Sequence, residues 1–278
     1  MSKIGIIGLG LMGGSLAKSL KKVKSVEKIL AYDEDIFTLK RAKEDGIIDE
    51  FTECIDKRFQ DLDFIFLCTP VNTIYEFADK LAKIVNPNCI ITDIGSTKEK
   101  IVKKIDKLGI NFVGGHPMIG RERFGYAFSS DDLYNNAYYI LTKTEKTNNK
   151  SIEKLKELLI QIHVIPIEME LEKHDFYVAT ISHVPHIIAS GLINLVKSTD
   201  DENMTMKTIA AGGLKDITRI ASANPDMWKN ICMQNKEEIL LVLEQFQKII
   251  DEFKKNIDNE EETLKFFQTA KEYRDNIH

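Results

Sequence analysis

Short apolar runs alternate with amphipathic stretches along the first part of the chain. The runs typical of β-strands are Lys3–Ile7, Lys28–Tyr32, Phe64–Cys68, Cys89–Thr92, Asn111–Gly115, Tyr138–Leu141 and Val164–Ile167. Between them, apolar residues recur at helical spacing in Met12–Lys22, Ile36–Asp45, Val71–Ile84 and Ser151–Ile162. Alternating strands and helices imply right-handed crossovers, so we expect an α/β fold with a doubly wound, mostly parallel sheet.

Beyond Glu168 the pattern is helical only, and we expect no further strand. Asp175–Val196 predicts a helix that Pro185 should kink, because proline cannot donate the helical hydrogen bond. A second helix should begin at Asn224-Pro225-Asp226, which has the residue types of a helix start. Its apolar stripe consists of Ile231, Ile239, Leu243, Phe246, Ile250, Phe253 and Ile257. Such a stripe is typical either of a core-facing helix or of a helical subunit interface.

This change of pattern divides the chain into a sheet domain, residues 1–167, and an all-α domain, residues 168–278. No Pro-, Gly- or Ser-rich spacer separates the two, so we expect them to pack rigidly against each other. The 278 residues are enough for two modest domains and leave little room for a third.

Composition narrows the class of protein. The net charge of -5 argues against a nucleic-acid groove, which needs a basic excess. The four cysteines form no C-x-x-C pair, so we expect reduced thiols in a cytoplasmic protein, with neither a zinc site nor disulfides. No apolar run approaches the roughly 18 residues of a membrane helix, and we expect no membrane partner.

A dinucleotide fingerprint follows the first predicted strand. Gly8-Leu-Gly10-Leu11-Met12-Gly13 has the form G-x-G-x-x-G and opens a helix. Gly8 permits the tight turn, Gly10 lets the backbone approach a pyrophosphate, and Gly13 lets helix and strand pack closely. Asp33 ends the second strand, where a carboxylate accepts hydrogen bonds from ribose hydroxyls. With no arginine beside Asp33, the sequence predicts a Rossmann-type domain that binds NAD rather than NADP; the alternative is a glycine-rich turn without a ligand.

Two more segments come directly after predicted strands. Thr69 and Pro70 follow one strand, and Ser96 lies in the Gly95–Lys98 segment after the next. In a doubly wound sheet the carboxyl ends of the strands line the ligand crevice, so Thr69 and Pro70 should contact the cofactor. Ser96 should point at the nicotinamide edge, or it could cap a helix over Lys98–Lys107, or do both.

His116 is the candidate base. It lies just beyond the predicted strand Asn111–Gly115, in a segment with Gly114, Gly115 and Gly120 that indicates a close-approach backbone. Histidine has the side-chain pKa suited to taking a proton near neutral pH, as oxidation of an alcohol requires. The alternative is a structural loop histidine.

The helical part supplies two further sets of polar residues. His183 and His186 are three residues apart, but no matching carboxylate or cysteine set accompanies them, so a metal site is disfavoured. One of the two histidines should face the cleft while the other is satisfied in the packing. Lys215 and Arg219, spaced i, i+4, share one helix face as either a carboxylate clamp or, with Asp216, a surface ion-pair cluster.

Together these motifs resemble the prephenate/arogenate dehydrogenase family of tyrosine biosynthesis over nearly the whole chain. The segments that carry the resemblance are Gly8–Ser15, Asp33, Gly95–Lys98, Gly115–Gly125, Ser182–His186 and Gly213–Arg219. The H-P-M-x-G segment, the later S-H-x-P-H and the K-D-x-T-R are far more specific than the fingerprint alone.

The resemblance implies an NAD-dependent oxidative decarboxylation of prephenate to 4-hydroxyphenylpyruvate. It implies that His116 accepts the hydroxyl proton and that Ser96 orients the hydroxyl and the imidazole. Arg219 would bind a substrate carboxylate with Lys215 in support, and His186 would donate a further hydrogen bond. Glu122 resembles the family's gating acid, which would pair with Arg219 or Asp216. The resemblance also implies a homodimer formed through the helical domain.

Two departures from the family pattern bear on the substrate. Ile119 is larger than the usual residue, and Arg121 adds a positive charge near the pocket. The extra cation favours prephenate, a dianion, over the alternative substrate arogenate. Less favoured readings are a β-hydroxyacid dehydrogenase and a non-catalytic NAD-sensing protein. From the length we expect neither a fused chorismate mutase nor a regulatory domain.

Overall fold

The computed structural model of the chain describes residues 1–120, 123–143 and 147–277. Within these residues, eight strands form one sheet in the order β3-β2-β1-β4-β5-β6-β7-β8. The strands are β1 Ser2–Ile7, β2 Val26–Tyr32, β3 Glu50–Thr52, β4 Phe64–Leu67, β5 Ile90–Asp93, β6 Phe112–Pro117, β7 Tyr138–Lys143 and β8 Ile165–Glu170. Only the β6–β7 pair is antiparallel among the strand pairs of this described sheet, which confirms the predicted α/β fold.

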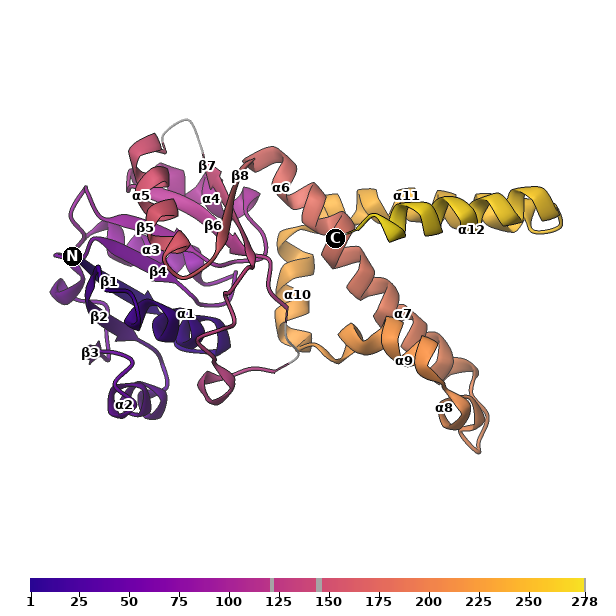
Figure 1. Ribbon diagram of the computed structural model, residues 1–278, viewed down its shortest axis with the longest axis horizontal. Helices are drawn as coiled ribbons and strands as arrows, with labels where there is room; N and C mark the ends of the chain where they lie inside the picture. The colour runs from indigo at the N-terminus through magenta and orange to yellow at the C-terminus, as the bar shows by residue number, and fades with distance from the viewer. Residues whose placement is uncertain (121–122, 144–146, 278) are drawn as a thin grey trace.

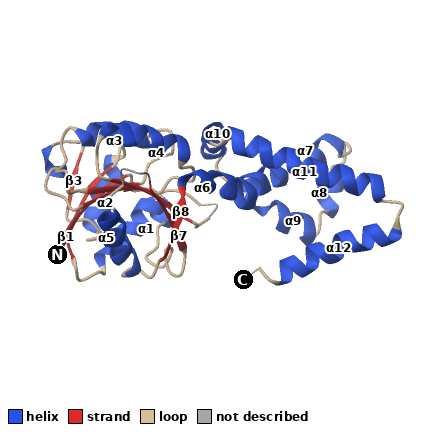
Figure 2. Cartoon of the chain, turned by 90° about the horizontal axis from the view of Figure 1, so that it is seen from above, coloured by secondary structure: helices blue, strands red, loops and turns tan. Residues whose placement is uncertain are grey.

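Helices cover both faces of the sheet (Figure 2). One face carries α1 Leu11–Lys21, α2 Ile36–Glu44 and α5 Asn149–Ile160, and the other carries α3 Ile74–Ala82 and α4 Glu99–Ile105. Each face has its own buried cluster, with Leu16 and Leu155 in one and Phe77 and Val102 in the other. Burial on both sides is why β4 reads as an uninterrupted apolar run.

Two strands differ from the sequence prediction. The prediction missed β3, because three residues on the edge of a sheet leave no periodic signal. In the structure β6 extends to Pro117, so His116 lies inside the strand and not beyond it. The extension arises because β6 pairs with β5 through Phe112 and Val113 and then with β7 through Gly114–Pro117. β8 likewise runs on to Glu170, past the point where strands were expected to stop.

The remaining chain is helical and projects away from the sheet (Figure 1). Its α-helices are α6 Leu171–Val178, α7 Val184–Thr199, α8 Thr205–Ile209, α9 Gly212–Thr218, α10 Pro225–Gln234, α11 Lys236–Asn256 and α12 Glu260–Asp275. Helix α12 runs back along α11, where Phe266 lies with its ring centre 4.9 Å from that of Phe253. The stripe from Ile231 to Ile257 therefore lies on two helices, because the chain turns at Asn235.

The helix expected to kink at Pro185 changes its winding instead. Residues Ala179–His183 form a π-helical turn between α6 and α7. Pro185 cannot donate to the carbonyl of Ile181, and its ring crowds that carbonyl, so a wider turn just before the proline relieves both problems. This turn directs His183 inward, where it is almost fully buried.

If the π turn is included, Leu171–Thr199 forms one continuous helix. Among the described residues it is the one helix long and apolar enough to cross a membrane, and its most apolar window has a mean hydropathy of 1.4. Only 28% of its most apolar window is buried within the chain. Its first turns, however, hold the buried polar residues His174, Asp175 and His183. Helices α9 and α11 also pack against it, so it serves here as the central helix of the α-helical part.

Gly115 lies where β6 closely approaches the end of β5. A Cβ atom at this position would lie 2.3 Å from the carbonyl oxygen of Asp93, and one at Gly114 would lie 2.3 Å from Oγ1 of Thr142. The predicted close approach is therefore present at Gly114 and Gly115. It is absent at Gly120, where a Cβ would meet no described atom within 4 Å.

We expect Gly115→Ala to destabilise the protein by about 1–3 kcal/mol, because the backbone of β5 must move to admit the methyl group. Thermal unfolding should show this as a Tm lower by roughly 2–4 °C per kcal/mol. Gly120→Ala is the matched control and should leave Tm unchanged. Equal Tm values for the two variants would contradict this account of the β5–β6 contact.

Candidate functional site

The loop between β1 and α1 has the geometry of a dinucleotide site. Gly8 has a φ of +95°, and a Cβ there would lie 2.7 Å from the carbonyl oxygen of Cys68. At Gly13 a Cβ would lie 1.9 Å from the carbonyl oxygen of Gly8, whereas Gly10 has no described atom within 4 Å of that position. Gly8 and Gly13 thus close the turn, while Gly10 leaves an open approach to the N-terminus of α1. No side chain caps that terminus, which suits a pyrophosphate.

Asp33, Thr69 and Pro70 lie at the same edge of the sheet. The Asp33 carboxylate accepts hydrogen bonds from the N–H of Leu9 (2.6 Å) and from that of Asp35 (2.9 Å). It therefore holds the glycine loop while remaining partly exposed. The Oγ1 of Thr69, just after β4, is buried without a hydrogen-bond partner among the described residues. A buried hydroxyl of this kind, beside Pro70, fits a site that a bound cofactor completes.

A fully buried ion pair holds the end of β5. The Nζ of Lys98 contacts Oδ2 of Asp93, and both side chains are inaccessible to solvent. The remaining acceptor sites of Asp93 receive the N–H of Gly95 (2.9 Å) and the N–H of Gly115 (3.0 Å). Since a buried charge is costly unless it is paired and hydrogen-bonded, this arrangement ties the loop after β5 to β6.

Ser96 lies in this tied loop, half-buried, between Gly95 and Thr97. The structure contradicts its reading as a helix cap, because α4 has no side-chain cap from within the loop. Asp175 of the helical part accepts the first amides of α4 instead, from Lys98 N–H (2.8 Å) and Glu99 N–H (3.0 Å). Ser96 is therefore not committed to capping.

His116 is joined to Asp175 through a second histidine. Its Nδ1 lies 2.9 Å from Nε2 of His174, and Nδ1 of His174 lies 2.6 Å from Oδ1 of Asp175. All three side chains are buried, with exposed fractions of 7% for His116, 0% for His174 and 2% for Asp175. The result is a carboxylate–histidine–histidine series that ends at the carboxyl edge of the sheet.

Burial sets the protonation of this series. Burial, followed by the neighbouring His174 and Lys98, lowers the pKa of His116 well below 6.5. Burial also lowers the pKa of His174, although Asp175 opposes that effect. Burial raises the pKa of Asp175, but hydrogen bonds from His174 and from the α4 amides outweigh it and leave a net lowering. Near neutral pH the series therefore holds two neutral imidazoles and one carboxylate, and His116 is ready to accept a proton.

His183 and His186 have different surroundings. His183 is buried, its Nδ1 lies 3.0 Å from Nδ2 of Asn235, and burial lowers its pKa to about 4. His186 is half-buried and stacks on Trp228 with ring centres 3.8 Å apart. Among the described residues, no group of three histidine, cysteine, aspartate or glutamate side chains could hold a metal ion. Of the two histidines, His186 is the one with an accessible ring.

Lys215 and Arg219 were predicted to share one helix face, but they do not lie on one regular helix. Lys215 lies on α9, which ends at Thr218, and Arg219 opens the 3-10 turn Arg219–Ser222. Both side chains are exposed, and the turn packs against α7, the helix that carries His186. Glu122 and Arg121, the candidate gate and the added cation, lie outside the described residues.

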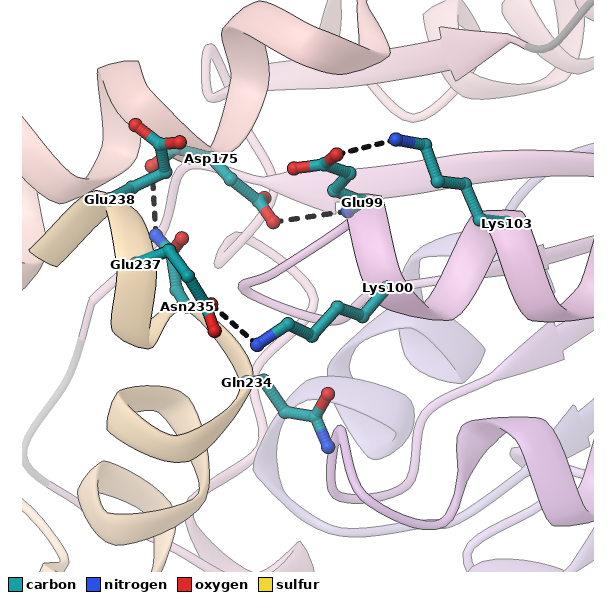
Figure 3. Close-up of a pocket in the computed structure, with 8 residues that line it drawn as sticks. All are labelled: Glu99, Lys100, Lys103, Asp175, Gln234, Asn235, Glu237 and Glu238. Carbon is teal, nitrogen blue, oxygen red and sulfur yellow. Dashed lines mark hydrogen bonds and ion pairs between the residues drawn. The ribbon is translucent and has the colours of Figure 1, made fainter.

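A cavity of about 290 Å³ lies between α4 and the helical part, and the buried Asp175 and Asn235 are among the residues that line it (Figure 3). Across it, Nζ of Lys100 contacts Glu237 at 2.6 Å. Nδ2 of Asn235 donates to the carbonyl oxygen of Asp175 at 2.8 Å. At this cavity the described residues of the two parts of the chain meet through hydrogen bonds and an exposed ion pair.

Sequence reasoning missed His174, Asp175, Trp228 and the Asp93–Lys98 pair. His174 precedes Asp175, where a helix was expected to begin, so the His-Asp dipeptide at a helix start was the available signal. Nothing in the sequence indicates that Trp228 would stack on His186, since 42 residues separate them.

Comparison with known proteins places the chain among relatives. Two family models match it: "Prephenate dehydrogenase, nucleotide-binding domain" over residues 16–166 and "Prephenate dehydrogenase, dimerization domain" over residues 170–272. Prephenate dehydrogenase of Bacillus subtilis is 36% identical over 278 residues, covering 98% of this chain and 75% of that protein.

Solved structures of similar proteins come from the same family. Prephenate dehydrogenase from A. aeolicus, crystallised with hydroxyphenyl propionate and NAD+, has a TM-score of 0.95 and 35% identity, covering 100% of this chain and 99% of that one. Synechocystis arogenate dehydrogenase has a TM-score of 0.87 and 29% identity, covering 98% of this chain and 99% of that one.

We expect Asp33→Asn to weaken NAD binding roughly 10–100-fold, the range for losing a hydrogen bond to a charged group. The same change should reduce discrimination against NADP, because the repelling charge is gone. Titration calorimetry with each dinucleotide measures both effects. Glu34→Gln is the matched control, since it removes a charge from the neighbouring exposed residue. If both variants bind NAD equally well, Asp33 does not hold the cofactor.

Proposed function

This chain belongs to the prephenate dehydrogenase family, and from that membership and the site we propose that it oxidises and decarboxylates prephenate to 4-hydroxyphenylpyruvate with NAD. The observation that carries the proposal is His116, a buried neutral imidazole. It lies at the carboxyl edge of the sheet, the same edge at which the dinucleotide loop lies. A base is needed there because the alcohol must lose its proton as the hydride departs. The alternative is arogenate as substrate, as in the Synechocystis relative.

Each residue has a definite task in this reaction. Gly8, Gly10, Leu11, Met12, Gly13, Asp33, Thr69 and Pro70 would hold NAD, which would supply the acceptor for the hydride of the hydroxyl-bearing carbon. His116 takes the hydroxyl proton at Nε2, and Ser96 orients the hydroxyl. Loss of CO2 makes the ring aromatic, so the protein's work is orientation and proton removal.

Substrate binding is assigned to the helical part. Arg219 holds a carboxylate, supported by Lys215, and His186 donates a hydrogen bond from its accessible ring. Two cations suit a dianionic substrate electrostatically. Glu122 is retained as the gating acid on the strength of the family pattern alone.

We further propose a homodimer formed through residues 168–278, with residues 1–167 as the cofactor domain, in a soluble cytoplasmic enzyme. The central buried cluster of the helical part is small, consisting of Ala179, Val184, Ile239 and Val242. Large apolar side chains on its surface, among them Ile209, Leu264, Phe267 and Tyr273, are more than half exposed. Exposed apolar surface of this extent supports burial against a second subunit. The match to a dimerization-domain model supports the same arrangement.

The proposal is tested by mixing purified protein with NAD and either prephenate or arogenate and following NADH absorbance. Prephenate should be the better substrate, and His116→Asn should lower turnover roughly 10²–10⁴-fold while NAD binding is kept. No NADH from either substrate would refute the proposal.

Because the base must be neutral and its pKa lies well below 6.5, wild-type turnover should persist at pH 6.5 and fall only in more acidic solution.

Arg219→Ala should act mainly on the KM for prephenate, because it removes binding shared by ground state and transition state. Loss of a charge-assisted hydrogen bond raises KM roughly 10-fold or more. Steady-state kinetics at saturating NAD measure this. An unchanged KM would mean that the carboxylate is bound elsewhere.

A further inference from the structure

Asp175 links three parts of the molecule whose relative positions matter for the reaction. It lies in α6 of the helical part, accepts the first amides of α4 beside Ser96, and is linked through His174 to His116. Neither His174 nor Asp175 lies in the segments by which the chain resembles its family.

The hydrogen bonds fix the proton positions along this series. The carboxylate of Asp175 can only accept, so His174 donates from Nδ1. A neutral His174 then accepts at Nε2, and His116 must donate to it from Nδ1. The lone pair of His116 is left on Nε2, which makes no hydrogen bond among the described residues. The series therefore selects the tautomer in which the outward nitrogen is the base.

We propose that His174 and Asp175 are positioning residues that hold His116 in its reactive tautomer and orientation. This inference rests on the proposed function for its role in catalysis, but not for the tautomer itself. When His116 takes the substrate proton at Nε2, the cation that forms keeps its Nδ1–H bond to His174. The Asp175 carboxylate stabilises the charge from the far end of the series, and no further proton has to move.

The same contact makes the base dependent on how the two parts of the chain meet. His116 belongs to β6 of the sheet, whereas His174 and Asp175 belong to α6 of the helical part. The α4 amides bind both oxygens of Asp175 from the sheet side. The base can therefore be correctly oriented only when the helical part is docked on α4.

Asp175→Asn is the main test, because it removes the negative charge that orients His174 and stabilises the cation formed on His116. We expect kcat for prephenate to fall roughly 10²–10⁴-fold, as for the equivalent change in a serine-protease triad. The KM values for prephenate and NAD should change by less than about threefold, since the lost charge affects the transition state alone. A general loosening of the site would raise KM instead.

Two further variants separate positioning from folding. His174→Phe keeps the ring volume and leaves Asp175 free to cap α4, so it should fold and still lose at least about tenfold in kcat. Lys100→Ala removes the exposed ion pair with Glu237 across the same junction and should leave kcat within about twofold.

The tautomer is measured without any substrate by nitrogen NMR of histidine-labelled protein, which is tractable with six histidines. His116 should carry its proton on Nδ1 in the wild-type protein, with the signals assigned from His116→Asn. A wild-type His116 protonated on Nε2, or Asp175→Asn with wild-type kcat, would overturn the proposal. Absence of turnover with either substrate would refute the proposed function alone, because the NMR result stands without it.

Discussion

A buried carboxylate must be given enough hydrogen-bond donors to replace the water it has lost, and this requirement organises the junction of the molecule. Asp175 meets it with two amides of α4 and a ring nitrogen of His174. The donors come from both parts of the chain, so the two parts cannot separate without exposing an unsatisfied charge or an uncapped helix. The contact is costly to break, and the candidate base depends on it.

A second buried carboxylate, that of Asp93, holds segments together in the same way inside the sheet. Asp93 at the end of β5 is paired with Lys98 and accepts amides from Gly95 and Gly115. Removal of one partner would leave the other charge buried alone, which costs several kcal/mol in proteins, about 3–5. The loop that carries Ser96 and the strand that carries His116 are thereby held in fixed relation. Glycine at position 115 is needed because no side chain fits between β6 and the carbonyl of Asp93.

The helical part is held together differently. Its buried cluster is small, and the helix from Leu171 to Thr199 is apolar over much of its length yet mostly uncovered within one chain. Its polar contacts are concentrated at one end, where His174, Asp175 and His183 face the sheet and Asn235. Polar groups thus specify the docking of the two parts, while the remaining apolar surface is available for association with another subunit.

The sequence by itself determined the fold class, the dinucleotide loop and the identity of the candidate base. Each depends on local pattern: strand and helix periodicity, three glycines at fixed spacing, and one histidine next to a buried strand. The break of the long apolar stripe at Asn235 and the short strand Glu50–Thr52 left no such pattern. Tertiary structure alone decided that His116 lies within β6, that Asp175 caps α4 in place of Ser96, and that His174 joins the two. These contacts link residues 58 to 77 positions apart, and only the packing of one part of the chain on the other brings them together.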